Sequence, residues 1–399
     1  MNVPFFRPSL TDAEINEVVS CLRSGWLTSG PLAKRFETEF AAAVGAKHAV
    51  AVNSATAALH LAVEALVLKP GDAVLVPTMT FAATAEIVRY QGATPILVDC
   101  DPDTFNMDLG DAEQKITDLR LGRLPAAIDP NSPVVGMIPV HVSGVMMDIA
   151  ALKSFAEERD LWIIEDAAHA FPAAWRSAPT RPWQHCGRGT ARVSCYSFYA
   201  NKTITTGEGG MAVTDDSALA DRMRMMSLHG LSHDAWNRYS GGSWDYRIVA
   251  PGFKYNLTDV AAAIGVHQLA RAEELRRRRE ALAHQYLEAF QDVQTLELPP
   301  VPADRLLPWH LFPIRLRLDK VSLDRNAFMA ALKERGIGTS VHWRPLHLHP
   351  YYAEQFGWRP EHLPVATQTW PRLVSLPLYP DMTPEEQNYV IQNVRELCH

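Results

Sequence analysis

Short runs of Val, Ile, Leu and Ala alternate with longer amphipathic segments over the first half of the chain, and this rhythm constrains the fold more than any other feature. The runs expected to form strands are 48–52, 73–76, 95–98, 134–142 and 161–164, and the helices expected between them are 57–68, 82–91 and 150–158. Strands without polar alternation are typical of a mostly parallel sheet that is covered on both faces. We therefore predict an α/β fold with a doubly wound domain of about 240 residues.

Helix signals flank this region on both sides. Thr11 and Glu14 form a capping box before a helix that ends at Gly25, and a second helix follows until Gly45. Beyond the sheet we expect a long helix over 258–290, strands over 311–318 and 374–378, and helices over 326–335 and from 383 onward. The predicted organisation is a large α/β domain (1–255), a long connecting helix (256–298) and a smaller C-terminal α/β domain (299–399).

The composition excludes several classes of function. The chain has 38 basic and 45 acidic residues among its 399, a net charge of −7, so it lacks the basic surface that nucleic-acid binding requires. Acids interleave with the one dense basic run, 276–279, which favours a solvated helix face over a phosphate site. No apolar run approaches the roughly 18 residues of a membrane span, and the N-terminus does not resemble a signal peptide.

The cysteines indicate a reducing environment. There are five, an odd number, and none forms a Cys-x-x-Cys pair. This spacing argues against a disulfide scaffold or a zinc ribbon and favours reduced thiols in a cytoplasmic protein.

The interpretation of this chain's function depends on the segment of sequence that contains Lys202. An apolar strand-like run precedes it and a Gly-rich reversal follows, so its amine is a candidate for desolvation and a depressed pKa. Such an amine suits Schiff-base chemistry with an aldehyde cofactor. The commoner alternative is a solvated surface lysine, so the interpretation needs further support.

Other expected strand ends carry groups that complement such a cofactor. Ala55 and Thr56 open a helix, where free N–H groups form a phosphate seat, although an ordinary helix cap is the alternative. Asp166 ends a buried strand and either pairs with a cationic ring nitrogen or caps the next turn. Phe81 either stacks on a flat ring or belongs to the core. Ser197 offers a hydroxyl to a phosphate but by itself is uninformative. In combination these are the parts that pyridoxal 5′-phosphate needs.

The sequence resembles the DegT/DnrJ/EryC1/StrS sugar aminotransferases, which are fold-type I pyridoxal-phosphate enzymes. The resemblance is carried by 53–56, 165–170, 197–210 and 375–378 and runs from Phe5 to near the C-terminus. Within the family, segments 24–31, 251–259 and 332–339 are most similar to enzymes that aminate C4 of a UDP-4-keto-pentose, as in 4-amino-4-deoxy-L-arabinose synthesis.

The resemblance implies a role for each candidate residue. Lys202 forms the Schiff base with the cofactor, Asp166 holds the ring nitrogen protonated, and His169 lies near the phenolic oxygen. Phe81 stacks on the ring. Ala55, Thr56 and Ser197 hold the phosphate.

Two positions bear on assembly and on reaction type. Many relatives have Asn at position 254 and reach across a dimer to the phosphate, whereas this chain has Lys254, which can bind a phosphate as a point charge. A homodimer with shared active sites is therefore expected. Dehydratase relatives replace the Schiff-base lysine with His, so Lys202 favours transamination.

The resemblance further implies L-glutamate as the amino donor, 2-oxoglutarate as its product and a nucleotide-linked 4-keto sugar as the acceptor. A UDP-4-keto-pentose is expected, and a UDP- or dTDP-linked 4-keto-6-deoxyhexose is the alternative. Trp26, the loop 239–252, His342 and Arg344 are candidates to line the substrate pocket. The histidines at 342, 347 and 349 lack the spacing and the nearby acid of a metal site, so no metal is expected.

Two other classes of protein fit the sequence less well. A regulatory protein that keeps the cofactor fold as a sensor would need a recognition module, for which the chain has neither a basic domain nor spare length. A nicotinamide dehydrogenase would fit the parallel sheet but lacks the Gly-x-Gly-x-x-Gly turn after the first strand.

Overall fold

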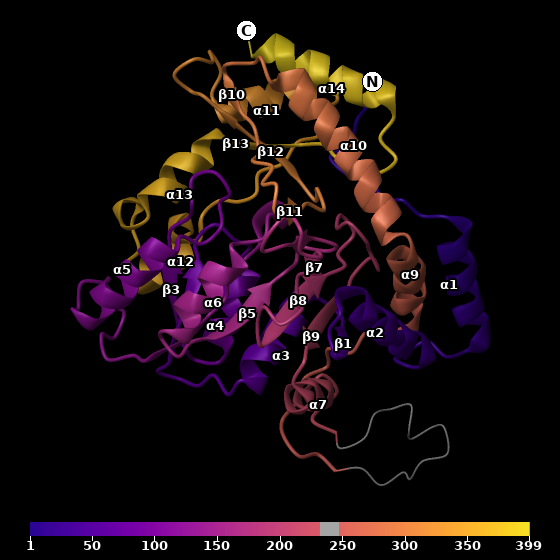
Figure 1. Cartoon of the computed structure of the whole chain (residues 1–399), viewed down its shortest axis with the longest axis vertical. Helices are drawn as coiled ribbons and strands as arrows, with labels where there is room; N and C mark the ends of the chain where they lie inside the picture. The colour runs from indigo at the N-terminus through magenta and orange to yellow at the C-terminus, as the bar shows by residue number, and fades with distance from the viewer. Residues whose placement is uncertain (232–246, 399) are drawn as a thin grey trace.

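A seven-stranded sheet forms the centre of the larger part of the molecule in the computed structural model, and a smaller part stands above it (Figure 1). The structure describes residues 1–231 and 247–398. Most of the expected pocket loop 239–252 therefore lies outside the described residues. Both chain termini lie at the end of the molecule formed by the smaller part (Figure 1).

The large sheet confirms the predicted fold class. Its strand order is β1 (His48–Val52), β9 (Gly210–Thr214), β8 (Val193–Ser197), β5 (Trp162–Asp166), β4 (Val134–Met137), β2 (Ala73–Pro77) and β3 (Thr94–Val98). The strands from β8 to β3 are parallel, and β9 runs antiparallel to both of its neighbours. The expected strand 134–142 is shorter than predicted, because it ends at Met137.

Both faces of this sheet are buried, as the unbroken apolar strands predict. Successive side chains of a strand point to opposite faces, and the core divides accordingly. Val50 and Val52 of β1 belong to one hydrophobic cluster, while Ala49 and Ala51 belong to another. The first cluster is covered by α3 (Ala55–Ala65), α4 (Ala83–Tyr90), α5 (Leu109–Arg120), α6 (Ile149–Glu157) and α7 (Ser217–Met226), and the second by α2 (Pro31–Val44) and α9 (Asp259–Ala270).

Most predicted helices are present, with some differences. The capping box of Thr11 and Glu14 opens α1 (Asp12–Ser24) as expected. Helices α5 and α7 were not predicted. The helix expected over 258–290 is instead two helices, α9 and α10 (Ala272–Phe290), separated at Arg271.

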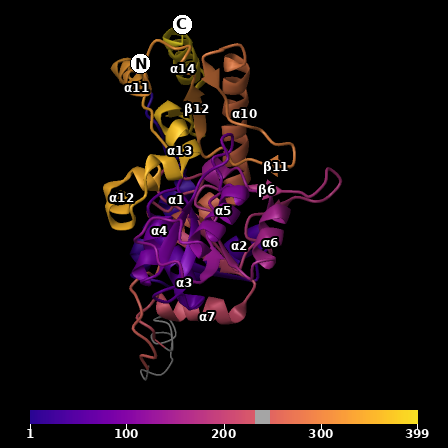
Figure 2. The ribbon, with the colours of Figure 1, turned by 90° about the vertical axis from the view of Figure 1, so that its left-hand side faces the viewer.

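The smaller part has its own hydrophobic core. An antiparallel sheet in the order β10 (Leu296–Glu297), β12 (Phe312–Leu316) and β13 (Leu373–Leu376) packs with α10, α11 (Arg325–Glu334) and α14 (Pro384–Leu397). Short helices α12 (Pro350–Phe356) and α13 (Pro364–Thr369) lie beside the larger part (Figure 2). A minor sheet of β11 (Arg305–Leu306), β6 (Ala174–Trp175) and β7 (Gln184–His185) completes the strands.

The structure also tests the expectations drawn from composition. All five cysteines are free and buried. Among the described helices, none combines the length and the apolarity that crossing a bilayer requires. The basic run is only partly solvated: Arg277 and Arg278 pair with acids at the surface, but Arg276 and Arg279 are buried.

Candidate active site

Asp166 is the last residue of β5, and its carboxylate is buried where the parallel strands end. Its Oδ2 accepts a hydrogen bond of 2.8 Å from the Thr84 hydroxyl, and its Oδ1 accepts one of 3.1 Å from the Ala168 amide. Burial raises the pKa of Asp166, against the opposing effect of these bonds and of the charge of Lys202. A protonated ring nitrogen would supply the cation that this buried carboxylate favours.

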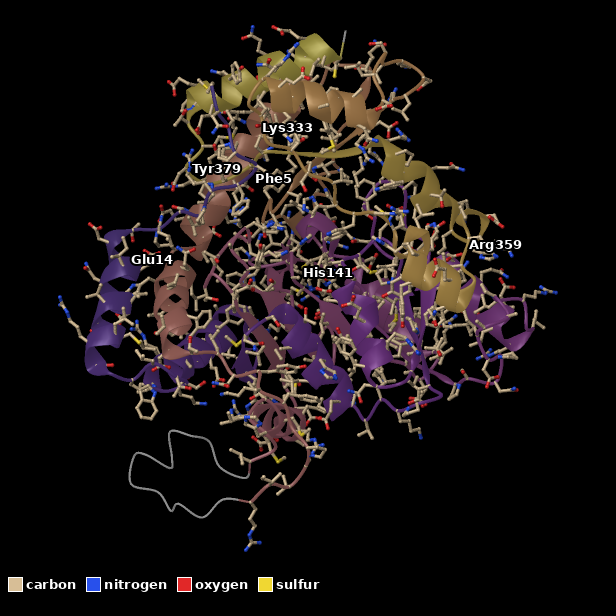
Figure 3. The ribbon with its side chains drawn as sticks, turned by 180° about the vertical axis from the view of Figure 1, so that it is seen from behind. Phe5, Glu14, His141, Lys333, Arg359 and Tyr379 are labelled. Atoms are coloured by element: carbon tan, nitrogen blue, oxygen red, sulfur yellow. The ribbon has the colours of Figure 1, made fainter. Side chains whose placement is uncertain are left out.

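Glu165 faces the opposite side of the same strand and belongs to a different network. Its carboxylate accepts hydrogen bonds from Ser194 and, at 2.7 Å, from Thr190, and it lies 3.2 Å from Nε2 of His141. Figure 3 labels His141 in the interior of the larger part. With Cys186 these groups form a cluster that is compact enough for a metal ion, but its carboxylate oxygens already have protein donors. We therefore read it as a structural network beneath the site.

Lys202 lies in the turn between β8 and β9. Its backbone N–H donates to the carbonyl of Tyr199 at 2.9 Å. Burial lowers the pKa of its amine to about 8, although the charge of Asp166 acts in the opposite direction. The predicted desolvated lysine is thus present and lies near the predicted acid.

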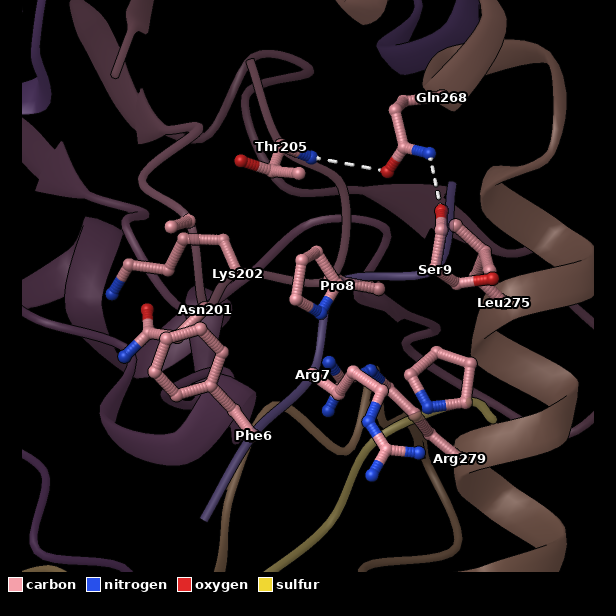
Figure 4. Close-up of a pocket in the computed structure, with 13 residues that line it drawn as sticks. Phe6, Arg7, Pro8, Ser9, Asn201, Lys202, Thr205, Gln268, Leu275 and Arg279 are labelled. Atoms are coloured by element: carbon pink, nitrogen blue, oxygen red, sulfur yellow. Dashed lines mark hydrogen bonds between the residues drawn. The ribbon is translucent and has the colours of Figure 1, made fainter. Parts of the chain in front are cut away.

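A small pocket adjoins Lys202 on the side of the N-terminal segment (Figure 4). Phe6 to Ser9 cover this pocket, and Gln268 ties them to the lysine turn: its side chain accepts a hydrogen bond of 3.3 Å from Thr205 and donates one of 2.8 Å to the carbonyl of Ser9. The N-terminal segment therefore closes one side of the candidate site.

The predicted phosphate seat assembles from three segments. Ser54 caps α3 by accepting a hydrogen bond of 3.1 Å from Ala57, so Ala55 and Thr56 form the first turn. Ser197 pairs with Gly210 across the β8–β9 ladder. A side chain at Gly210 would lie 2.4 Å from the carbonyl carbon of Ser54, so only glycine permits this approach. The structure thus brings Ser197 beside the helix N-terminus, where anions bind favourably.

Phe81 lies just before α4 and is 63% exposed. Its carbonyl accepts a hydrogen bond of 3.3 Å from the Thr84 hydroxyl, which also donates to Asp166. The core alternative for Phe81 is therefore excluded in this chain. An exposed ring in the turn that holds the Asp166 partner is available to stack on a flat ligand.

His169 is buried within a group of aromatic rings. Its ring stacks on Trp343 at 4.9 Å, and the ring centroid of His310 lies 4.3 Å away. Its Nδ1 accepts a hydrogen bond of 3.3 Å from the backbone N–H of Ser143, which leaves the proton on Nε2. Burial and the charge of Lys202 hold the pKa of His169 well below its usual value, so the ring is a neutral donor.

His342 joins the same group from the smaller part. Its ring lies 6.4 Å from that of His169 and 5.7 Å from that of Phe5, and its Nδ1 lies 2.9 Å from the Ser375 hydroxyl. Burial, with the charge of Lys202 as a second cause, lowers the pKa of His342 to about 4. The structure therefore places this predicted substrate residue beside the lysine.

Three other predicted residues have hydrogen bonds to residues outside this group. Trp26 donates its indole N–H to the Ser29 carbonyl at 3.2 Å, before α2. Arg344 is exposed and donates to the Leu348 carbonyl at 2.6 Å. Lys254 is exposed and bonds to the Asn256 side chain.

The site fits pyridoxal 5′-phosphate in its donors and acceptors. A buried carboxylate, an amine whose pKa burial lowers to about 8, an exposed aromatic ring and a helix N-terminus lie at the ends of β5, β8, β2 and β1. Burial is the largest cause of the pKa shifts of Asp166 and Lys202, and the charge of each residue opposes the shift of the other.

The match to a family model decides the assignment. The model for the DegT/DnrJ/EryC1/StrS aminotransferase family matches residues 8–395. The chain belongs to this family. It is also 43% identical, over 99% of its length and 97% of the relative's, to the spore coat polysaccharide biosynthesis protein SpsC of Bacillus subtilis.

Solved structures of similar proteins share the whole fold. The PMP-form of the putative sugar aminotransferase Spr1654 from Streptococcus pneumoniae superposes with a TM-score of 0.88 at 31% identity, covering 100% of this chain and 99% of that one. DesV of S. venezuelae, in complex with a ketimine intermediate, gives 0.86 at 32% identity with the same coverage. Spr1654 also has a solved PLP-form. The expectation of a pyridoxal-phosphate-dependent aminotransferase is confirmed.

Two residues of the site escaped the sequence analysis. Thr84 stands in the segment that contains Phe81, but its bond to Asp166 joins residues 82 positions apart. His310 lies in a buried run before β12 and carries no motif. No pattern within a single stretch of sequence could have indicated either contact.

Proposed function

We propose that this family member transfers the amino group of L-glutamate to C4 of a nucleotide-linked 4-keto sugar, with a UDP-4-keto-pentose as the preferred acceptor. The observation that carries the amine chemistry is Lys202, whose amine has a pKa of about 8 beside the Asp166 carboxylate. The preference for the pentose is supported by the likeness of segments 24–31, 251–259 and 332–339 to enzymes with that substrate.

Each candidate residue then has a defined task. When bound, pyridoxal 5′-phosphate supplies an aldehyde that takes up amines and a ring that withdraws electrons from the reacting carbon. Asp166 accepts a hydrogen bond from the ring nitrogen and keeps it protonated. The Lys202 amine would hold the cofactor through its aldehyde and, when free, would accept and return the proton at the reacting carbon. His169 donates from Nε2 to the phenolic oxygen.

The remaining cofactor residues orient the group. The backbone N–H groups of Ala55 and Thr56 and the hydroxyl of Ser197 bind the phosphate, and Phe81 covers one face of the ring. His342 is a neutral donor for the substrate, because its pKa of about 4 leaves it uncharged near neutral pH. Trp26 and Arg344 remain candidates for the nucleotide part.

We further infer a homodimer in which Lys254 binds the phosphate of the neighbouring subunit. Its side chain is exposed, and its backbone carbonyl lies 3.4 Å from Nδ2 of Asn53, next to the phosphate seat of its own chain. A residue at the edge of one phosphate seat can approach the phosphate seat of a second subunit when the two subunits meet at this surface. The cytoplasm, where nucleotide sugars are made, is the proposed location.

The direct test combines purified enzyme, cofactor and L-glutamate with a panel of acceptors, followed by product mass. The panel holds a UDP-4-keto-pentose, a UDP-4-keto-6-deoxyhexose and a dTDP-4-keto-6-deoxyhexose, and Lys202→Ala is the control. We expect the UDP-4-amino-pentose to form faster than the product of either hexose. A faster reaction with either hexose would replace the proposed substrate, and no amination of any sugar would refute the function.

A further inference from the structure

The imidazole of His141 is completely buried, and hydrogen bonds hold both of its nitrogens. Its exposed fraction is 0%, and it lies in the interior of the larger part (Figure 3). Its Nδ1 accepts a hydrogen bond of 3.3 Å from the backbone N–H of Met147, so the proton of the ring lies on Nε2. This Nε2 lies 3.2 Å from Oε1 of Glu165 and donates to it. The ring therefore joins the loop that follows β4, residues 142–147, to strand β5.

Glu165 anchors the other end of this hydrogen bond. Its carboxylate also accepts hydrogen bonds from the hydroxyls of Ser194 and, at 2.7 Å, of Thr190. Burial raises the pKa of Glu165, but hydrogen bonds, that from His141 first, lower it further, so the carboxylate is ionised. Each bond that such a carboxylate loses leaves part of its charge unsatisfied in the interior, which is costly. Movement of the His141 ring away from β5 is therefore unfavourable.

The backbone next to this ring pairs with the peptide of Asp166. The N–H of Asp166 donates to the Pro139 carbonyl at 2.9 Å, and the N–H of His141 donates to the Asp166 carbonyl at 3.3 Å. Val140 is the residue opposite Asp166 in this parallel pairing. The pairing of β4 with β5 thus continues beyond Met137, where β4 ends, to the last residue of β5. Residues 139–141 therefore hold the backbone from which the Asp166 carboxylate projects.

The same loop also holds His169. The backbone N–H of Ser143 donates to Nδ1 of His169 at 3.3 Å. Ser143 has a φ of 56°, a left-handed conformation that is uncommon for residues other than glycine, so the loop holds this N–H in place at a cost. A Cβ on Gly144 would lie 2.7 Å from the carbonyl oxygen of His169, so the two backbones are in close contact. The contact that leaves the proton of His169 on Nε2 thus depends on the loop that His141 closes.

We propose that His141, held by Glu165, is a positioning residue that fixes both the place of the Asp166 carboxylate and the tautomer of His169. This assignment rests on the proposed function, in which these two side chains contact the ring nitrogen and the phenolic oxygen of the cofactor. His141 acts through residues 139–147, which contact both side chains, and not by touching a reacting group. A buried ring that only fills space would instead be replaceable by an apolar ring of similar size.

The test compares variants of the two bonded side chains with a matched control. His141→Phe keeps a planar ring without nitrogens, His141→Gln keeps an N–H donor for Glu165, and Glu165→Gln keeps an acceptor without the charge. The control is His347→Phe. The His347 ring is also buried, and its nitrogens lie 2.8 Å from the hydroxyls of Thr78 and Thr367, which bond to none of the described candidate cofactor residues. The measurements are kcat, the melting temperature and the pH midpoint of the visible absorbance of the bound cofactor.

For His141→Phe we expect the pH midpoint to rise by about one unit. A protonated ring nitrogen and a donor at the phenolic oxygen both withdraw electrons from the ring, so their loss makes the nitrogen that joins the cofactor to Lys202 more basic. We expect kcat to fall at least about tenfold, and His141→Gln to recover most of both changes. Glu165→Gln should raise the midpoint by less. His347→Phe should lower the melting temperature but leave the midpoint unchanged.

Two outcomes overturn the assignment. One is a midpoint and a kcat of His141→Phe equal to those of the wild type, which would mean that the ring only fills space. The other is an equal shift of the midpoint in His347→Phe, which would mean that the site responds to any loosening of the core. Where His141→Phe fails to fold, an unchanged midpoint in Glu165→Gln overturns the assignment. A wild-type enzyme that aminates no sugar would refute the proposed function, whereas failure of this assignment leaves wild-type amination intact.

Discussion

The hydroxyl of Thr84 donates a hydrogen bond of 2.8 Å to Oδ2 of Asp166, joining the first turn of α4 to the end of β5. A second hydroxyl, that of Thr80, lies 2.7 Å from Oγ1 of Thr84. The hydrogen bond from Thr84 lowers the pKa of Asp166, whereas burial, the larger effect, raises it. The carboxylate that is proposed to hold the ring nitrogen protonated is therefore kept ionised partly by a neighbour far away in sequence.

Replacing Thr84 by Val should impair catalysis without removing the cofactor. The loss of a hydrogen bond to a charged group, worth about 1.5–3 kcal/mol, raises the pKa of Asp166 and weakens its hold on the ring nitrogen. We expect kcat to fall about 10- to 100-fold, with cofactor stoichiometry unchanged. Thr84→Ser keeps the hydroxyl and is the matched control. Equal activity of the Val and Ser variants would contradict this role for the bond.

The reaction of the cofactor-free enzyme with pyridoxal 5′-phosphate should depend on pH through Lys202. Because the neutral amine attacks the aldehyde, and a pKa of about 8 replaces the usual 10.5, the rate should rise as the pH increases through about 8. Stopped-flow absorbance at several pH values measures this midpoint. Asp166→Asn removes the charge that raises the lysine pKa, so the midpoint should move to lower pH. A midpoint near 10 in the wild type would show that the amine is solvated.

Gly210→Ala should weaken cofactor binding. The added Cβ would lie 2.5 Å from the Ser54 carbonyl oxygen and 2.6 Å from the Ala55 nitrogen, so the N-terminus of α3 must move away from Ser197. We expect the dissociation constant of pyridoxal 5′-phosphate to rise at least about tenfold, measured by equilibrium dialysis. Gly110→Ala is the control, because its Cβ meets only the flexible Asp108 carboxylate, at 3.1 Å. Similar affinities for both variants would place the phosphate elsewhere.

Mixed dimers test whether Lys254 acts across the subunit interface. Chains carrying Lys202→Ala or Lys254→Ala are each expected to be impaired, but a dimer of one with the other contains one complete site. Co-expression with different tags should restore about a quarter of wild-type activity, since half of the dimers are mixed and each has one working site. Activity that does not exceed that of the separate variants would place Lys254 in its own chain's site or outside any site.

The strand-end residues could be predicted because they follow from local patterns. Unbroken apolar strands place Asp166 at the carboxyl end of a covered sheet, and the Gly-rich reversal places Lys202 in the turn that follows β8. Local sequence patterns also predicted the capping box of α1, and they predicted the bounds of this helix to within one residue. The antiparallel direction of β9 depends on pairing with β1, some 160 residues earlier in the chain.

The rest of the site depends on contacts between distant segments. Glu165 and Asp166 are adjacent in sequence but face opposite sides of β5, and the structure places Asp166 near Lys202, the choice that the family resemblance implied. The basic run was expected to be solvated, yet Arg279 is buried because α10 enters the core of the smaller part at that residue. His310 acquires its surroundings from the same packing.

Borohydride reduction of the cofactor-loaded enzyme, followed by peptide mass mapping, tests the proposed attachment most directly. We expect one pyridoxyl-phosphate adduct per chain, located on Lys202, and loss of the adduct in Lys202→Arg. An unmodified Lys202, or an adduct on another lysine, would contradict the assignment of the catalytic amine.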